Sequence, residues 1–171
     1  MNRIAGCVLL FLLVVGLSGC GDIRRPENRP EIGLPGSERT VVKVDSRKEW
    51  VPTSVWVQAG DRVAFHASGI WIDAFIPCHA DGYPAPWLYN WNRPPRIPDN
   101  GRYFRLMGRI VPDGLQPRED DPAETFVIGN ESERTADHAG RLFVFANDRE
   151  GYYWNNFGSV TLTIEKVSGQ Q

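Results

Sequence analysis

The sequence predicts an all-β fold, an antiparallel β-sandwich of the jelly-roll kind, on three observations. Short segments rich in Val, Ile, Phe and Thr recur along the chain, and several alternate between apolar and polar residues. Clusters of Gly, Asp and Asn mark turns between such segments. No window carries a capped helical period of useful length. These patterns favour two packed sheets with about seven or eight strands.

The first expected strands lie before residue 70. Residues 40–45 (TVVKVD) and 63–67 (VAFHA) are short and rich in β-formers, and the second segment alternates with period two. Between them, Trp56 and Val57 precede the sequence QAGD at residues 58–61, which is typical of a turn.

The second half of the chain supplies the clearest strand patterns. Expected strands are residues 103–111 (YFRLMGRIV), 124–129 (ETFVIG), 140–146 (GRLFVFA) and 159–167 (SVTLTIEKV). The apolar run in the third is continuous enough for a central strand. In the last, Val160, Leu162 and Ile164 face one way and the intervening polar residues face the other.

Two connections are too long to be simple turns. Residues 71–101 contain six prolines and three of the six tryptophans, and residues 112–123 form a polar segment. Loops of such length inside compact domains usually have a function or are disordered. The aromatic density of residues 71–101 argues against disorder, so we expect a function there.

The N-terminus predicts secretion and attachment of lipid. Arg3 precedes an apolar run over residues 8–17, which is too short to span a bilayer and is typical of a signal peptide. The ending LSGC resembles the bacterial lipobox, which implies cleavage before Cys20 and lipidation of that residue. Gly21 then implies sorting to the outer membrane of a Gram-negative bacterium. The alternative is an ordinary signal peptide with a chance cysteine.

Four segments follow from this reading of the chain. Residues 1–19 are the expected signal peptide, 20–38 the lipidated Cys and a flexible tether, 39–168 the sandwich domain, and 169–171 a tail. The tether is rich in Pro, Gly and charge, and flexible-chain scaling gives it a span of about 20–25 Å. The expected location is therefore the cell envelope, anchored by lipid.

Charge and cysteine usage exclude two classes of protein. The formal net charge of −2, without a basic stripe, argues against binding of nucleic acid. Of the three cysteines, Cys7 leaves with the signal peptide and Cys20 takes lipid, so Cys78 has no partner within the domain. A framework of internal disulfides is therefore excluded.

One hairpin connection carries more polar groups than a turn needs. Residues 147–158, NDREGYYWNNFG, contain three amides, two acids and three adjacent aromatic residues between two expected strands. A two-residue turn needs only Gly or Asn at positive φ. The surplus side chains indicate a binding role, although a turn that uses Asn in left-handed positions is the simpler alternative.

The order of these features resembles the PA-I galactophilic lectin family over roughly residues 50–167. The resemblance is carried by VWVQAGDRVAFHASGIW, a DG pair, LMGRI, FVIG, HAGRLFVFAND and NNFGSVTLTI. Its most specific part is Asn147-Asp148, six intervening residues, Asn155-Asn156, one residue and Gly158. The family's members are β-sandwiches of the galactose-binding-domain-like kind, and one calcium ion in each holds hydroxyls of a galactose.

The resemblance implies a calcium site in residues 147–158. Asp148 would supply a carboxylate, and Asn155 and Asn156 would supply side-chain oxygens. Main-chain carbonyls would come from Tyr152 and from about Asp73. Calcium prefers six to eight oxygen ligands, whereas zinc favours His and Cys, so these residue types suit one weakly bound calcium ion.

The resemblance also implies a glycan ligand, galactose-like in kind, touched by Asp148 and Asn155. The family's sugar-contacting His and Gln, expected beyond Asp81-Gly82, are replaced here by Pro86 and Tyr89. Aromatic rings that could stack on the sugar are those of Trp154, Trp87 and Tyr89. The identity of the sugar and the oligomeric state stay open.

Two other classes of function are weighed against a lectin. A structural or interaction lipoprotein could keep the sandwich and lose both metal and sugar, with the rings of residues 152–154 filling the pocket. Cys78, His79 and Asp81 include the residue types of a thiol nucleophile or zinc site, but neighbours in sequence seldom form one. No catalytic residues are expected, and the chain is not predicted to be an enzyme.

Overall fold

The computed structural model describes residues 37–84, 95–97, 102–118 and 125–167. The chain divides into two compact units, Met1–Ile32 and Gly33–Gln171, and every described residue belongs to the second. The predictions that concern the signal peptide, Cys20, Trp87 and Tyr89 lie outside the described residues. Within the described part, no helix is both long enough and apolar enough to cross a membrane.

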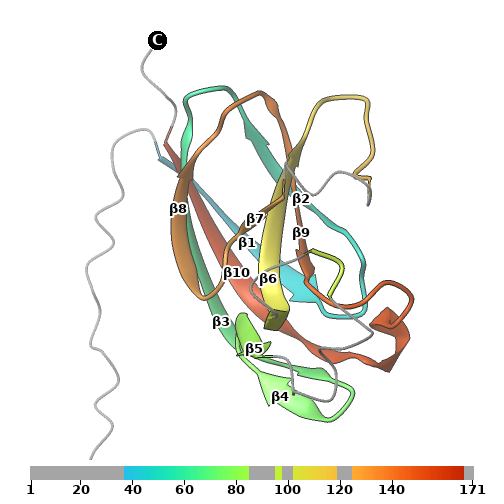
Figure 1. Ribbon diagram of the computed structural model, residues 1–171. Helices are drawn as coiled ribbons and strands as arrows, with labels where there is room; N and C mark the ends of the chain where they lie inside the picture. The colour runs from blue at the N-terminus through green and yellow to red at the C-terminus, as the bar shows by residue number, and fades with distance from the viewer. Residues whose placement is uncertain (1–36, 85–94, 98–101, 119–124, 168–171) are drawn as a thin grey trace, which may run out of the picture. The chain divides into compact units, whose positions relative to one another are not determined.

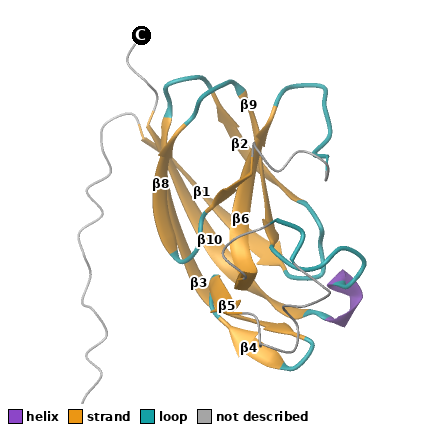
Figure 2. Cartoon of the chain, viewed as in Figure 1, coloured by secondary structure: helices purple, strands orange, loops and turns teal. Residues whose placement is uncertain are grey.

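The described part is built from strands and one short 3-10 turn (Figures 1 and 2). The elements are β1 (Ser37–Asp45), β2 (Val51–Val57), β3 (Arg62–Asp73), β4 (Ile76–Cys78), β5 (Asp81–Pro84), β6 (Arg102–Val111), β7 (Thr125–Val127), β8 (Glu131–Thr135), β9 (Gly140–Ala146), η2 (Tyr153–Asn155) and β10 (Phe157–Val167).

Two antiparallel sheets make up the fold. One has the order β1-β10-β3-β4, with β8 also pairing with β3, and the other has the order β2-β9-β6-β5, with β7 pairing with β6. Residues of both sheets contribute to one buried apolar cluster between them. The predicted antiparallel β-sandwich is confirmed.

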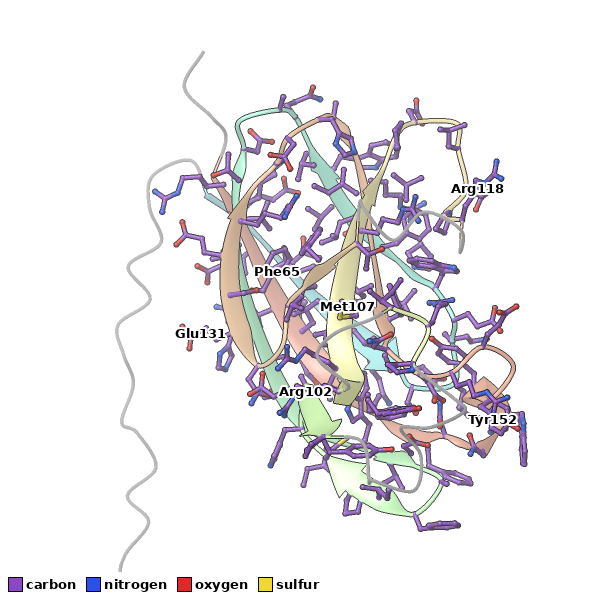
Figure 3. All side chains as sticks on the ribbon, in the orientation of Figure 1. Phe65, Arg102, Met107, Arg118, Glu131 and Tyr152 are labelled. Carbon is purple, nitrogen blue, oxygen red and sulfur yellow. The ribbon has the colours of Figure 1, made fainter. Side chains whose placement is uncertain are left out.

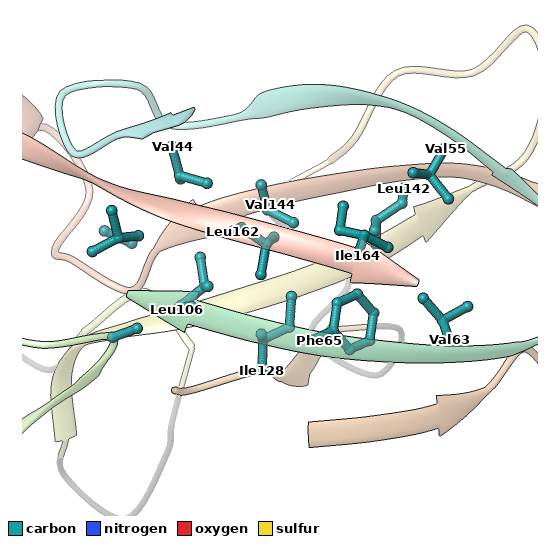
Figure 4. Close-up of a cluster of buried hydrophobic side chains, with 14 of the residues drawn as sticks. Val44, Val55, Val63, Phe65, Leu106, Ile128, Leu142, Val144, Leu162 and Ile164 are labelled. Atoms are coloured by element: carbon teal, nitrogen blue, oxygen red, sulfur yellow. The ribbon is translucent and has the colours of Figure 1, made fainter. Parts of the chain in front are cut away.

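The core follows from period-two alternation in the central strands. Val160, Leu162 and Ile164 of β10 are fully buried. Figure 4 shows Leu162 and Ile164 in one apolar cluster with Phe65 of β3. Burying each such side chain stabilises the fold by about 1.5–3 kcal/mol. The intervening residues of β10 face outward, which is why the sequence alternates so cleanly.

The register of β3 and β10 brings two distant segments to one end of the sandwich. The pairing runs from Arg62 opposite Val167 to Ile72 opposite Phe157. The turn after β3 therefore lies beside the β9–β10 connection, residues 147–156, which precedes Phe157. Figure 1 shows β4 and β5 at this same end.

Four strands, β2, β4, β5 and β8, were not among those expected from the sequence, and the last three have weak sequence signals. The sequence predicts one connection over residues 71–101, but β3 continues to Asp73, and β4 and β5 follow within the segment. β3 continues because the long β10 offers it ladder partners up to Phe157. β8 has the polar sequence ESERT and pairs with β3 through its main chain, so it lacks apolar alternation.

Candidate functional site

A cavity of ≈ 230 Å³ opens at the end of the sandwich where β3 ends and β10 begins. Its walls come from the β3–β4 turn, β5, β6 and the β9–β10 connection. The lining residues are Asp73, Ala74, Phe75, Ile76, Tyr83, Tyr103, Asp148, Arg149, Tyr152 and Asn155. Four of the five residues predicted to bind metal are therefore brought to one cavity from two parts of the chain.

Asn156, the fifth predicted metal residue, is joined directly to Asp148. Asp148 is 3% exposed, and its Oδ2 accepts a hydrogen bond of 2.8 Å from Nδ2 of Asn156. The main-chain N–H of Arg149 donates to Oδ1 of Asp148 over 2.6 Å. Asn156 is fully buried, and its Nδ2 also donates to the carbonyl of Ser46 over 3.1 Å. The amide nitrogen of Asn156 is therefore fully used by two acceptors.

Two amide oxygens at this site have no hydrogen-bond partner. Oδ1 of Asn155 and Oδ1 of Asn156 are both shielded from solvent and accept no hydrogen bond within the described part of the chain. A buried acceptor without a partner costs about 1–3 kcal/mol. Such oxygens are retained where something else satisfies them, such as a cation.

Asn147, in the same stretch, shows the opposite arrangement. Its Oδ1 accepts from the main-chain N–H of Ile97 over 3.0 Å, and its Nδ2 donates to the carbonyl of the same residue over 2.8 Å. Its side chain thus holds a neighbouring segment in place. The three amides of this connection divide into one structural clamp and two with free oxygens.

Asp73 brings a second carboxylate to the cavity. This residue ends β3 and is 9% exposed, and the hydroxyl of Tyr83 donates a hydrogen bond to its Oδ2. Burial raises the pKa of Asp73, and the hydrogen bond from Tyr83 partly opposes that change. The predicted role of Asp73 involved only its main-chain carbonyl, whereas its side chain also points to the interior.

The two carboxylates affect each other electrostatically. Burial raises the pKa of Asp148 to about 6, and the charge of Asp73 adds to the increase. The hydrogen bond from Asn156 and the charge of Arg149 oppose it. Both groups therefore resist ionisation in the metal-free protein, and a bound cation would favour their ionised forms.

The donors at this site fit a hard cation that prefers oxygen. They comprise two carboxylates and two unpaired amide oxygens, and Tyr152 also lines the cavity, with its main-chain carbonyl accepting from the N–H of Asn155 over 3.2 Å. Across the described ranges, no three His, Cys, Asp or Glu side chains gather as a zinc site would require. The residues thus suit calcium, which accepts neutral amide and carbonyl oxygens alongside few carboxylates.

The three adjacent aromatic residues do not fill the cavity. Tyr153 is buried, and its hydroxyl donates to the carbonyl of Ala146 over 2.8 Å. Trp154 is 70% exposed and lies outside the cavity lining, so its role as a stacking ring stays a prediction. Tyr152 does line the cavity, with the Arg149 guanidinium 4.3 Å from its ring centre.

The turn η2 explains this division of the aromatic residues. Its single 3-10 turn directs Tyr153 inward, Trp154 outward and Asn155 toward the cavity. Figure 3 places Tyr152 at the end of the sandwich that carries β4 and β5, away from Phe65 in the interior.

Several lining residues were missed by sequence reasoning. Phe75 is 84% exposed at the cavity, and Tyr83 and Tyr103 stack with ring centres 6.0 Å apart. Their signal was weak because they sit within or after the segment interpreted as one long connection. The positive φ of Ala74, 54°, shows that the turn carrying Phe75 is strained.

The alternative thiol or zinc site is not assembled. Cys78 is a buried free thiol, and burial raises its pKa to about 12, which disfavours the reactive thiolate. Nδ1 of His79 lies 2.9 Å from the carbonyl of Gly69, and the carboxylate of Asp81 accepts hydrogen bonds from Asn130. The three residues thus have separate partners.

Comparisons with known proteins address the fold. No family model matches the chain, and no curated protein matches it. A similar solved structure is described as "EclA N-terminal domain; PllA-like lectin". It shares 20% sequence identity at a TM-score of 0.53, and the match covers 77% of this chain and 98% of that one. The chain therefore has a lectin-like fold.

Proposed function

We propose that this chain is a lipid-anchored envelope protein whose sandwich domain binds a carbohydrate through one calcium ion. The observation that carries the proposal is the buried acid–amide group at the cavity. Asp148 is bonded to Asn156, while Oδ1 of Asn155 and Oδ1 of Asn156 have no partner. The likeness to a structure described as a lectin supports the same class of function.

Each residue of the group has a role that its surroundings support. Asp148, Asn155 and Asn156 supply side-chain oxygens to the ion, and Tyr152 and Asp73 supply carbonyls. When bound, calcium offers open coordination positions that two neighbouring sugar hydroxyls can fill. Asp148 and Asn155 also hydrogen-bond to the sugar in this proposal. The rings of Phe75 and Tyr152 offer apolar surface for one face of the sugar, in addition to the stacking rings predicted from the sequence, those of Trp154, Trp87 and Tyr89.

The first described residue and the cavity lie at opposite ends of the domain. β1 begins at Ser37, opposite Val167, whereas the cavity lies beyond Phe157 at the other end of β10. Lipid on Cys20, a short tether and the outer membrane as location complete the proposal. The protein acts by binding, not by catalysis.

Titration calorimetry of the mature chain tests the metal half. Cys20→Ser keeps the protein free of lipid, and we expect calcium to bind with Kd of about 10⁻⁴–10⁻³ M. Asp148→Ala should abolish the heat. Asp61→Asn is the matched control, because Asp61 is also a buried aspartate (4% exposed) but lies at the other end of β3. Absence of heat at millimolar calcium rejects the metal site.

A glycan array read with calcium and with chelator tests the proposed binding of carbohydrate. Spots that vanish with chelator support the lectin. A second function, an anchored interaction domain, is favoured by the replacement of the family's His and Gln with Pro86 and Tyr89. Calcium binding together with a blank array would favour that function.

A further inference from the structure

We infer that the carboxylate of Asp73, held by the hydroxyl of Tyr83, is a second anionic oxygen donor for the cation. This inference rests on the proposed function, since it concerns the same site. It departs from the resemblance, which assigns only the main-chain carbonyl at this position.

The strand places the Asp73 side chain on the inner face of the sheet. In β3 the odd-numbered positions face the core, with Phe65 and Trp71 buried, and Asp73 continues the same row. Asp73 also lines the cavity together with Asp148. Period-two alternation thus directs this carboxylate to the interior rather than to solvent.

Tyr83 uses only one of the two carboxylate oxygens. Its hydroxyl donates to Oδ2 of Asp73, and no described residue donates to Oδ1. The ring of Tyr83 stacks on Tyr103 at an interplanar angle of 20°, which fixes the hydroxyl in position. A hydrogen bond of this kind commonly orients a carboxylate that binds metal through its other oxygen.

Two carboxylates, those of Asp73 and Asp148, line the cavity with one cationic side chain, that of Arg149. Within the described ranges, neither Asp73 nor Asp148 forms a salt bridge. Buried like charges are unfavourable unless an opposite charge lies between them. Asn156 is fully buried beside Asp148, and its Oδ1 lacks the hydrogen-bond donor or cation that a buried amide oxygen needs. A divalent cation satisfies both conditions.

Calorimetry on a set of four proteins tests the role of Asp73. The mature Cys20→Ser chain is compared with Asp73→Asn, Tyr83→Phe and Asp61→Asn in the same background. We expect Asp73→Asn to weaken calcium binding by on the order of 10-fold to 100-fold, because a charged donor is lost. Tyr83→Phe should weaken binding by on the order of 10-fold, as removal of an orienting hydrogen bond does. Asp61→Asn should leave the Kd unchanged.

Thermal melts in chelator show whether each variant is folded. Asp73→Asn removes a buried charge and keeps the shape of the side chain, so its metal-free melting temperature should not fall. Unchanged calcium affinity in a folded Asp73→Asn would overturn the inference and leave the proposed function intact. Unchanged affinity in Tyr83→Phe would overturn the part assigned to Tyr83. A parent chain that binds no calcium would reject the proposed function and this inference together.

Discussion

Strand β3 has a buried aspartate near each end, and the surroundings of the two carboxylates differ. Asp61 precedes the strand and is 4% exposed, and its Oδ2 accepts from the main-chain N–H of Gln58 over 2.9 Å. Its main-chain carbonyl accepts from Ala136 over 2.8 Å. Asp73, at the other end, lies beside a cavity and close to a second carboxylate.

The difference separates a structural acid from a candidate ligand. Asp61 closes a tight turn, and its carboxylate accepts a hydrogen bond from the main chain of that turn. Asp73 and Asp148 instead repel each other, and Asn155 and Asn156 keep free oxygens beside them. Burial of a polar group therefore says little about binding, whereas unsatisfied donors and acceptors that meet at a cavity indicate it.

A core truncation midway between the two ends should have the largest effect on stability. Leu162 is fully buried in the centre of β10, so Leu162→Ala should lower the free energy of unfolding by about 2–5 kcal/mol. Urea unfolding in chelator measures this loss. The same loss is expected in calcium, because Leu162 lies at the centre of β10 and does not line the cavity. A loss confined to one condition would contradict this view.

Calcium should stabilise the domain through the cavity end alone. At free calcium 100 times the Kd, the free energy of unfolding should rise by about 2.7 kcal/mol. Urea unfolding of the mature chain with calcium and with chelator measures the increment. The increment should persist in Asp61→Asn and vanish in Asp148→Ala; equal increments in both variants would reject the assignment.

The raised pKa of Asp148 predicts a pH dependence of the metal-free domain. The folded value is about 6 against 3.8 in the unfolded chain, so the folded state takes up a proton first as pH falls. Stability due to this group should therefore increase as pH falls through the window from about 6 to about 4, by about 1–3 kcal/mol.

The difference between the parent chain and Asp148→Asn isolates that contribution. The two should differ less at pH 5 than at pH 7 when unfolding is followed in chelator, because protonation neutralises Asp148 in the parent. A difference that does not change with pH would mean that Asp148 stays ionised in the folded protein.

Removing the charge of Asp61 should change the free energy of unfolding by less than the changes above and leave calcium binding unaffected. Asp61→Asn weakens a hydrogen bond to the main chain of Gln58, so a loss of roughly 1–2 kcal/mol in the free energy of unfolding is expected. Chemical denaturation gives the loss, and calorimetry gives the Kd. Weaker calcium binding in this variant would show that the two ends are coupled.

The smallest effect is expected in the turn after β3. Ala74 has a φ of 54°, which glycine adopts without steric cost, so Ala74→Gly should stabilise the metal-free domain by about 0.5–1 kcal/mol. Thermal unfolding in chelator measures the gain. Weaker calcium binding in Ala74→Gly would indicate that the strained turn helps to position Asp73.

The strands with one buried face and one exposed face could be predicted from the sequence. Val160, Leu162 and Ile164 alternate with polar residues because one face of β10 is buried and the other is not. The polar β8 and the short β4 and β5 could not, because main-chain pairing to neighbouring strands stabilises them without an apolar pattern of their own.

The site was only partly predictable for a related reason. The spacing from Asp148 to Asn155 and Asn156 is local, so sequence reasoning identified these residues as a group. The Asp73–Tyr83 hydrogen bond depends on how β3 and β5 pack, and no local pattern reveals it. The outward direction of Trp154 likewise follows from the single turn η2, which its neighbours do not signal.

The register of β1 against β10 has a mechanical consequence for the proposed anchoring and ligand binding. Tension from a tether would enter at Ser37, and tension from a bound glycan would enter beside Phe157, at the opposite end of the same strand pair. The load would then act along the strands, in shear, across all nine paired positions from Ser37 to Asp45 at once. A strand pair loaded in shear must break all its hydrogen bonds together, whereas a strand pair pulled apart from one end opens one hydrogen bond at a time.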